Sequence, residues 1–352
     1  MLAMALTLTH ATLDQQAERI EQVLASHRVP VKVHSGSVSP RWVRFMLTPG
    51  LGAKIATVRN LSEELAMALG ADEVRVARDG EALAVEVPRT DPQPVRLFSL
   101  MASLTEIPVL TACLGLADDG RPLLLRLPSA DVAHVLIAGM TGSGKTELMR
   151  TMLVSLALMN RQSKLQMALI DPKSRGFTSL AGLPHLLDDV ASDPASALSL
   201  LDRLIKEMER RDERGMSSPH IVIAIDELLD LFGAEEIAGR RVTRSGHTLE
   251  QALTRIAQRG REAGLHLVVG VQKPSASVIG SMLKANFPVR IVGRVGSAED
   301  ARVATGQGGT GAEKLMGHGD FIALAAGQLL RFQAAYIPAH DWARFAGSAP
   351  EE

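Results

Sequence analysis

The residues best suited to chemistry occupy one short run, Gly139 to Thr146, which has the spacing Gly-x-x-x-x-Gly-Lys-Thr. An apolar strand pattern precedes this run and a helical pattern follows it, which is the setting of a phosphate-binding loop. In such a loop backbone N–H groups wrap a triphosphate, while Lys145 reaches its β- and γ-phosphate oxygens and Thr146 binds Mg²⁺. The predicted nucleotide contacts are Gly139, Thr141, Gly142, Ser143, Gly144, Lys145 and Thr146. A glycine-rich turn without a ligand is the alternative, and the flanking strand and helix disfavour it.

A pair of acids follows a second apolar strand pattern, Ile221–Ile225. Asp226 would hold Mg²⁺ through water, and Glu227 would polarise the attacking water. Taken alone, an acidic pair in this position is often only the N-terminal cap of the next helix. Its combination with a phosphate loop favours hydrolysis of a nucleoside triphosphate instead. ATP is the expected substrate and Mg²⁺ the expected metal.

The elements that must position these residues alternate along residues 129–345. Apolar strand patterns cover Val135–Ala138, Leu165–Ile170, Ile221–Ile225, Leu265–Val271 and Val289–Val295, with a closing pair at Phe321–Ala325 and Leu329–Tyr336. Helical patterns occur at about 145–160, 196–214, 248–263 and 275–285. Such alternation predicts an α/β domain in which helices cover a largely parallel sheet.

The N-terminal part has a different pattern, in which helices and strands do not alternate regularly. Helical spacing is found at Leu13–Arg28 and Ser62–Leu69, and strand patterns at Val43–Leu47, Val74–Ala77 and Leu83–Val87. This predicts a smaller α+β domain. The expected organisation is therefore an α+β domain over 1–128, a nucleotide-binding domain over 129–345 and a tail over 346–352.

Composition limits the possible functions. The 352 residues are 46% hydrophobic, enough for two domains with cores of their own. Lys and Arg number 38 against 39 Asp and Glu, so any contact with nucleic acid must come from local loops. The single cysteine excludes an intrachain disulfide and a Cys-rich zinc site, which fits a reducing compartment. No apolar stretch is long enough to span a membrane, so the chain is expected in the cytoplasm.

Beyond the two nucleotide motifs, further blocks occur in a fixed order that resembles the FtsK/SpoIIIE DNA translocases of the HerA–FtsK branch of P-loop ATPases. The blocks are Ala138–Thr146, Ile170–Lys173, Gly182–Leu187, Ile225–Leu231, Ala257–His266, Val271–Ser275, Lys284–Pro288 and Gly311–Asp320. The N-terminal part resembles the α subdomain of that family through Val43–Gly50, Val58–Ala66 and Leu83–Arg89. The resemblance implies a RecA-like ATPase domain and a hexameric ring that threads double-stranded DNA.

The resemblance also implies roles for three residues outside the phosphate loop. Arg261 matches the arginine finger, which one subunit supplies to its neighbour to stabilise transition-state charge. Gln272 matches a polar sensor that faces the γ-phosphate, and with Glu227 and Arg261 it completes the expected catalytic set. The alternative for Arg261 is a solvated helix arginine, a reading that Arg259 could also fit. The alternative for Gln272 is a surface glutamine.

Three basic residues match positions that reach the DNA backbone in these motors, namely Lys273, Lys284 and Arg302. Six subunits share the phosphate contacts, so a few per subunit suffice for a nearly neutral chain. Taken singly, each of them reads as an ordinary surface charge, whereas the set on matched loops favours contact with DNA. Ala298 stands where relatives can carry lysine, and the arginine-containing segment Gly233–Thr248 is longer than the corresponding family loop. The longer segment could be a solvated insertion, or it could face DNA or a neighbouring subunit.

A second glycine pattern, Gly306–Gly311, follows a helical pattern and not a strand, so it is not a dinucleotide site. Neither the membrane region nor the winged-helix domain of division proteins is expected in this chain. The rival functions are a DNA-transfer or genome-packaging motor, a protein-secretion ATPase and a binding module with an inactive site. Intact Lys145, Asp226 and Glu227 disfavour the last.

Overall fold

The computed structural model describes residues 9–50, 55–79, 82–237, 246–274 and 286–342. These residues fall into two compact units, one within Met1–Pro94 and Leu116–Arg121, the other within Val95–Gly115 and Pro122–Glu352. The domain boundary expected near residue 128 stays a prediction. Strands β5 (Thr111–Ala117) and β6 (Pro122–Arg126) precede that position, yet both belong to the sheet of the larger unit.

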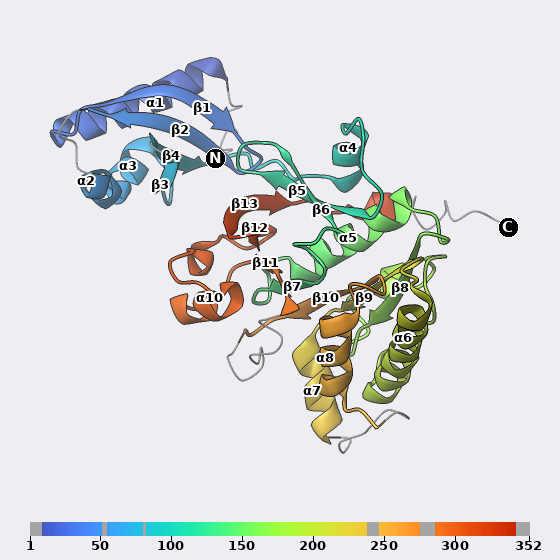
Figure 1. Ribbon diagram of the computed structural model, residues 1–352. Coiled ribbons are helices and arrows are strands. Elements are labelled where there is room, and N and C mark those ends of the chain that lie inside the picture. Colours follow the sequence, from blue (N-terminus) through green and yellow to red (C-terminus); the bar gives the residue numbers. More distant parts are fainter. Residues whose placement is uncertain (1–8, 51–54, 80–81, 238–245, 275–285, 343–352) are drawn as a thin grey trace. The chain divides into compact units, whose positions relative to one another are not determined.

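The smaller unit is an antiparallel sheet in the strand order β1-β2-β4-β3, covered on one face by helices (Figure 1). Its elements are α1 (His10–Ser26), β1 (Val31–Val38), β2 (Trp42–Pro49), α2 (Ile55–Asn60), α3 (Ser62–Leu69), β3 (Arg75–Asp79) and β4 (Ala82–Pro88). Alternate residues of a strand share one face, so Val43, Phe45 and Leu47 point together into the core. There they meet Leu24 of α1 and Leu65 of α3. This is the expected α+β arrangement.

The larger unit is built on a nine-stranded sheet in the order β6-β5-β13-β12-β11-β7-β10-β9-β8. Its remaining strands are β7 (Val135–Ala138), β8 (Leu165–Ile170), β9 (His220–Ile225), β10 (Leu265–Val271), β11 (Val289–Val292), β12 (Asp320–Ala325) and β13 (Gln328–Ala334). The five strands from β11 to β8 are parallel, whereas β12 pairs antiparallel with both β11 and β13. The predicted α/β class is confirmed.

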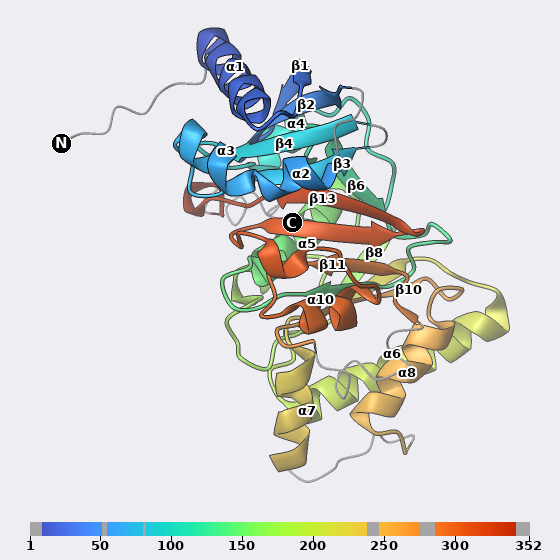
Figure 2. The same ribbon diagram turned by 90° about the vertical axis from the view of Figure 1, so that its left-hand side faces the viewer.

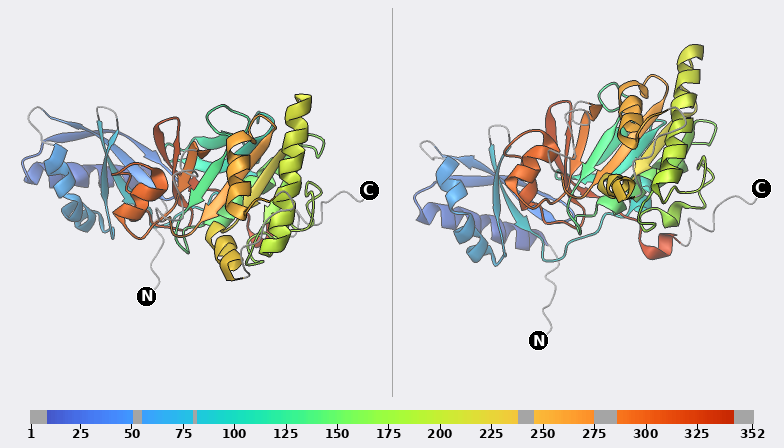
Figure 3. Two further views of the ribbon diagram at one scale, coloured as in Figure 1. Left: turned by 60° about the horizontal axis from the view of Figure 1, so that its bottom comes forward. Right: turned by 90° about the horizontal axis from the view of Figure 1, so that it is seen from below.

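Helices cover both faces of the parallel strands. They are α5 (Lys145–Met159), α6 (Pro194–Arg214), α7 (Leu228–Ile237), α8 (Leu249–Arg259) and α10 (Ala298–Thr305), with a short α4 (Leu97–Ala102) before β5. From β7 the chain crosses the sheet in one direction to β8, and it then returns in the other direction through β9 and β10. Because such crossovers are right-handed, α5 lies on one face of the sheet and α6, α7 and α8 lie on the other. Figure 2 shows the last three together on one side of the sheet. Figure 3 shows α6 as the long helix of this layer.

The core of the larger unit lies between the parallel strands and this helix layer. It joins Leu201 and Ile205 of α6 and Leu253 of α8 to Ile223 of β9 and Val269 of β10. The parallel strands are buried on both faces, which explains their continuous apolar sequences. No helix within the described residues is long and apolar enough to cross a membrane.

Candidate nucleotide-binding site

The phosphate loop connects β7 to α5, and its backbone shape depends on glycine. Gly142 and Gly144 have φ angles of 83° and 96°, in the left-handed region that side chains disfavour. A Cβ on Gly144 would lie 2.9 Å from the backbone nitrogen of Gly319. Gly144 is therefore required both by its backbone angles and by this close approach.

The segment just before β12, which includes His318 and Gly319, is hydrogen-bonded to the phosphate loop and clamps it. The N–H of His318 donates to the carbonyl of Gly142 at 2.9 Å, and the N–H of Gly319 donates to that of Ser143 at 2.8 Å. In a planar trans peptide the carbonyl and the N–H point in opposite directions. The N–H of Gly144, which shares a peptide with the Ser143 carbonyl, therefore points away from Gly319 and is not used by this contact.

A buried ion pair fixes this clamping segment. Asp320 and Arg331 are both buried, and the guanidinium donates to the two carboxylate oxygens at 2.9 and 2.8 Å. The same carboxylate accepts from the N–H of Met316 at 2.9 Å. The Gly319 carbonyl accepts from the N–H of Ala334 on β13 at 2.7 Å. The predicted Gly311–Asp320 block therefore has a structural role that the sequence alone did not reveal.

The four charged and hydroxyl side chains of the two motifs meet at the carboxyl ends of β7 and β9. Lys145 Nζ donates to the main-chain oxygen of Asp226 and lies 3.1 Å from its carboxylate and 3.7 Å from that of Glu227. The Thr146 hydroxyl donates to the Asp226 carboxylate at 2.8 Å. Strand β10 lies between β7 and β9 and supplies Gly270, which leaves room for this contact because its Cβ would meet Asp226 and Lys145.

Two polar atoms at this centre lack hydrogen bonds in a way that fits a magnesium nucleotide. The Glu227 oxygen nearest Lys145 and the Ser143 hydroxyl are buried, and neither has a hydrogen-bond partner among the described residues. Burial raises the pKa of Glu227, and the nearby Lys145 charge opposes that shift. The hydroxyl of Thr146 and the carboxylate of Asp226 are oxygen ligands of the kind that Mg²⁺ prefers. These residues fit the metal and a phosphate chain.

Gln272 lies directly after β10, as expected for the sensor position. Its backbone N–H donates to the second Glu227 carboxylate oxygen at 3.2 Å, and its side chain is half-buried. The ends of β9 and β10 are therefore joined through the expected water-activating acid. The next residue, Lys273, is exposed.

The other predicted DNA contacts are only partly placed by the structure. Arg302 is exposed on α10 and pairs with Glu299 of the same helix at 2.6 Å. Lys284 lies outside the described residues, as does 238–245 within the segment Gly233–Thr248. Ala298 is the first residue of α10.

Arg261 lies at the end of the sheet opposite its own phosphate loop. It is exposed in the turn between α8 and β10, and within the described chain its side chain has no hydrogen bond or ion pair. Arg259, by contrast, pairs with Asp212 at 2.6 Å. Strand β10 starts after the Arg261 turn and runs parallel to β7 to reach the phosphate loop. At about 3.3 Å per residue the strand spans roughly 20 Å, so Arg261 cannot reach the phosphate loop of its own chain.

A loop after β8 completes the wall around Asp226, and the sequence indicated it only as an Asp-Pro-Lys block. Asp171 is buried, and its carboxylate accepts from the N–H groups of Gly176 and Phe177 at 2.7 and 3.0 Å. A Cβ on Gly176 would lie 2.6 Å from the Asp226 carboxylate. Lys173 pairs with Asp230 at 2.6 Å, which raises the pKa of the lysine. The loop thus packs directly on the expected metal ligand.

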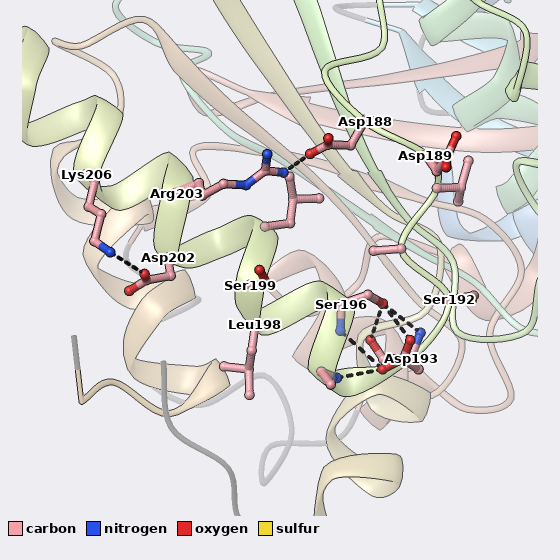
Figure 4. A pocket seen from close by; sticks show the side chains of 14 residues that line it. Asp188, Asp189, Ser192, Asp193, Ser196, Leu198, Ser199, Asp202, Arg203 and Lys206 are labelled. Carbon is pink, nitrogen blue, oxygen red and sulfur yellow. Dashed lines mark hydrogen bonds and ion pairs between the residues drawn. The ribbon is translucent and has the colours of Figure 1, made fainter. Parts of the chain in front are cut away.

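A separate pocket lies between α6 and the segment that follows β8 (Figure 4). Its wall carries the ion pairs Asp188–Arg203 and Asp202–Lys206, and Asp193 caps α6 there. None of the predicted nucleotide residues lines it.

A phosphate loop followed by an acid pair on parallel strands defines a nucleoside triphosphatase of the P-loop class. The FtsK/SpoIIIE family model matches residues 99–217, and the FtsK alpha domain model matches residues 4–89. The DNA translocase FtsK of Lactiplantibacillus plantarum is 32% identical over 94% of this chain and 44% of that protein. The DNA translocase SpoIIIE of Bacillus subtilis is 31% identical over 92% of this chain and 44% of its own. The chain belongs to the FtsK/SpoIIIE family, and it spans less than half the length of these relatives.

Solved structures agree with this fold. The pCW3 conjugation coupling protein TcpA, in its monomer form with ATPγS, has a TM-score of 0.59 at 18% identity over 93% of this chain and 96% of its own. The cytoplasmic domain of the type VII secretion ATPase EccC from Thermomonospora curvata has a TM-score of 0.60 at 26% identity, over 73% of this chain and 35% of that one.

Proposed function

We propose that this protein is an ATPase that moves along double-stranded DNA as a ring of identical subunits, with six as the expected number. The observation that carries the proposal is the convergence of Lys145, Thr146, Asp226 and Glu227 at one edge of the sheet. The relatives named DNA translocases supply the substrate. We place this activity in the cytoplasm, where the chain would meet both ATP and DNA.

The geometry supports hydrolysis in a simple sequence. Lys145 exchanges its contacts with Asp226 for the β- and γ-phosphate oxygens when ATP binds. Thr146 and Asp226 would hold Mg²⁺, which would neutralise developing phosphate charge. Glu227 accepts a hydrogen bond from the attacking water, and the N–H of Gln272 keeps the carboxylate oriented. The Gln272 side chain would sense the γ-phosphate.

The site is shared between subunits in this proposal. The length of β10 separates Arg261 from its own phosphate loop, and the exposed guanidinium has no partner among the described residues. A neighbouring subunit that docks against this turn would receive the guanidinium at its γ-phosphate. A finger of this kind can contribute about 10³-fold or more to the rate.

DNA contact is assigned to Lys273, Lys284 and Arg302. A net charge of −1 gives the chain no general affinity for nucleic acid. The contacts must therefore be few in each subunit and repeated around the ring. Arg302 would exchange its exposed pair with Glu299 for a DNA phosphate, at little cost because surface pairs are weak.

ATP hydrolysis with and without linear double-stranded DNA tests the proposal, together with electron microscopy of the DNA-bound protein. We expect DNA to stimulate the rate and rings to form. Lys145→Ala should abolish turnover, and Glu227→Gln should bind ATP without hydrolysing it. A protein that hydrolyses ATP equally with and without DNA, and forms no ring, would fit a secretion ATPase and contradict translocation.

A further inference from the structure

The turn that carries Arg261 is tightly built. The N–H of Gly264 donates to the Arg261 carbonyl at 3.1 Å, and the N–H of Leu265 donates to the Gly260 carbonyl at 2.7 Å. Gly264 has a φ of 75°, and a Cβ there would collide with the carbonyl oxygen of Ser217. The backbone beneath the exposed guanidinium therefore has little freedom, although the guanidinium itself is free to reach outward.

A buried arginine supports this turn from α6. Arg211 is 1% exposed in the last turn of that helix. Its Nη1 donates to the carbonyls of Ala263 at 2.9 Å and Pro219 at 2.7 Å, and its Nε donates to Glu207 at 2.7 Å. A planar guanidinium fixes direction as well as distance, because its donors cannot rotate independently. Arg211 thus ties the Arg261 turn to both α6 and the segment leading into β9.

Two further ion pairs align α8 on the same helix. Arg255 pairs with Glu209 at 2.5 Å, and Arg259 pairs with Asp212 at 2.6 Å. Both pairs are partly exposed and contribute little energy each. They hold the helix before the turn, whereas Arg211 is the buried contact that reaches the turn itself.

We propose that Arg211 is a positioning residue for Arg261. It sets the direction in which one subunit presents its finger to the nucleotide of the next, and it does not affect the nucleotide site of its own subunit. This inference rests on the proposed shared site. Displacing a catalytic group by about 1 Å can cost up to 10²-fold in rate, so loss of this support should be visible in turnover.

The test uses mixtures of variants whose defects lie on opposite sides of the interface. Arg211→Met, Arg261→Ala and Lys145→Ala are purified separately, and single-turnover ATP hydrolysis is measured on DNA for each and for equimolar mixtures. Lys145→Ala subunits still present an intact finger. If Arg211 acts through Arg261, Arg211→Met should hydrolyse ATP at least about tenfold slower alone and regain activity when mixed with Lys145→Ala. Its affinity for a fluorescent ATP analogue should stay within about twofold of the unmodified protein, since its own phosphate loop is intact.

Arg210→Met is the matched control, because Arg210 pairs with the same Glu207 but is only partly buried, and within the described residues it donates to no carbonyl of the turn. It should leave the rate unchanged. Arg211→Lys keeps the charge beside Glu207 and loses the planar fork, so an intermediate rate is expected, and this variant carries the test if Arg211→Met does not fold.

The outcomes separate the inference from the function on which it rests. If Arg261→Ala does not regain activity when mixed with Lys145→Ala, the shared site itself is wrong. If Arg261→Ala regains activity but Arg211→Met does not, the defect of Arg211→Met lies in its own site and the positioning role is overturned. Full activity of Arg211→Met alone would overturn it as well.

Discussion

Lys145 and Asp226 are in contact across 81 positions of sequence, with the ammonium of the lysine 3.1 Å from the carboxylate of the aspartate. Both side chains are almost fully buried. The lysine that would bind phosphate therefore neutralises the acid that would bind metal, so that neither charge is left unpaired in the core.

This contact predicts the metal dependence of Asp226→Asn. The amide keeps the shape of the side chain but removes the charge that attracts Mg²⁺, so the Mg²⁺ concentration for half-maximal ATP hydrolysis should rise by at least about tenfold. Titrating Mg²⁺ at a fixed ATP concentration measures this. Asp188→Asn, which changes an exposed acid paired with Arg203, should leave the titration unchanged. An unaltered Mg²⁺ requirement in Asp226→Asn would exclude Asp226 as the metal ligand.

Gly144→Ala should abolish nucleotide binding while leaving the rest of the fold in place. A left-handed φ of 96° costs a side-chain residue about 1–2 kcal/mol, and the new methyl group would press on the backbone of Gly319. The phosphate loop must then move away from Gly319. Equilibrium binding of a fluorescent ATP analogue and circular dichroism measure the two effects. Gly182→Ala is the control, because a Cβ at Gly182 would have no atom of the described residues within 4 Å, and this variant should bind the ATP analogue normally.

Arg331→Met should lower both stability and ATP affinity. Removing one partner of a buried ion pair typically costs about 3–5 kcal/mol, because the Asp320 carboxylate is left buried and unpaired. Since Asp320 holds the segment that clamps the phosphate loop, nucleotide binding should weaken as well. Urea unfolding with and without ATP and Mg²⁺ distinguishes the two effects. Arg302→Met breaks the exposed pair with Glu299, and the same unfolding curve should not shift.

The parallel strands could be predicted from the sequence because burial on both faces leaves a continuous apolar run. Val135–Ala138, Leu165–Ile170 and Leu265–Val271 were delimited in this way and are strands with those bounds. Strand β1 was not predicted because it lies at an edge of the small sheet, and because its short alternation over Val31–His34 ends at a register shift between Val33 and Ser35. Strands β5 and β6 were missed as well, although they extend the large sheet.

The site could be predicted only as far as its motifs. The phosphate loop and the acid pair have fixed chemistry and a fixed place after a strand, so Lys145 and Glu227 could be named from the sequence. The supports around them depend on strand order, which brings β12 and β13 beside the phosphate loop and the end of α6 beside the Arg261 turn. Arg211 therefore had no recognisable pattern, and Gly319 was named only as part of the block Gly311–Asp320, without a role.

Two buried histidines predict how the stability of this protein depends on pH. His134 accepts from the N–H of Leu267 at 2.9 Å, and His266 is hydrogen-bonded to the carbonyl of Ala133 at 2.9 Å. Burial lowers the pKa of each ring to about 4, whereas an unfolded histidine titrates near 6.5. The unfolded chain therefore binds more protons between these values, and stability rises with pH across that range.

The free energy of unfolding should therefore be highest above about pH 6.5. It should fall as the pH drops toward 4, by about 3 kcal/mol for each histidine. Urea unfolding between pH 7.5 and 4.5 measures the slope. His134→Gln removes one titrating group, so its stability should fall less steeply with acid than that of the unmodified protein. His27→Gln, which changes a histidine on the surface of the smaller unit, is the control and should keep the original slope. If His134→Gln also keeps that slope, the ring is not neutral and buried in the folded protein.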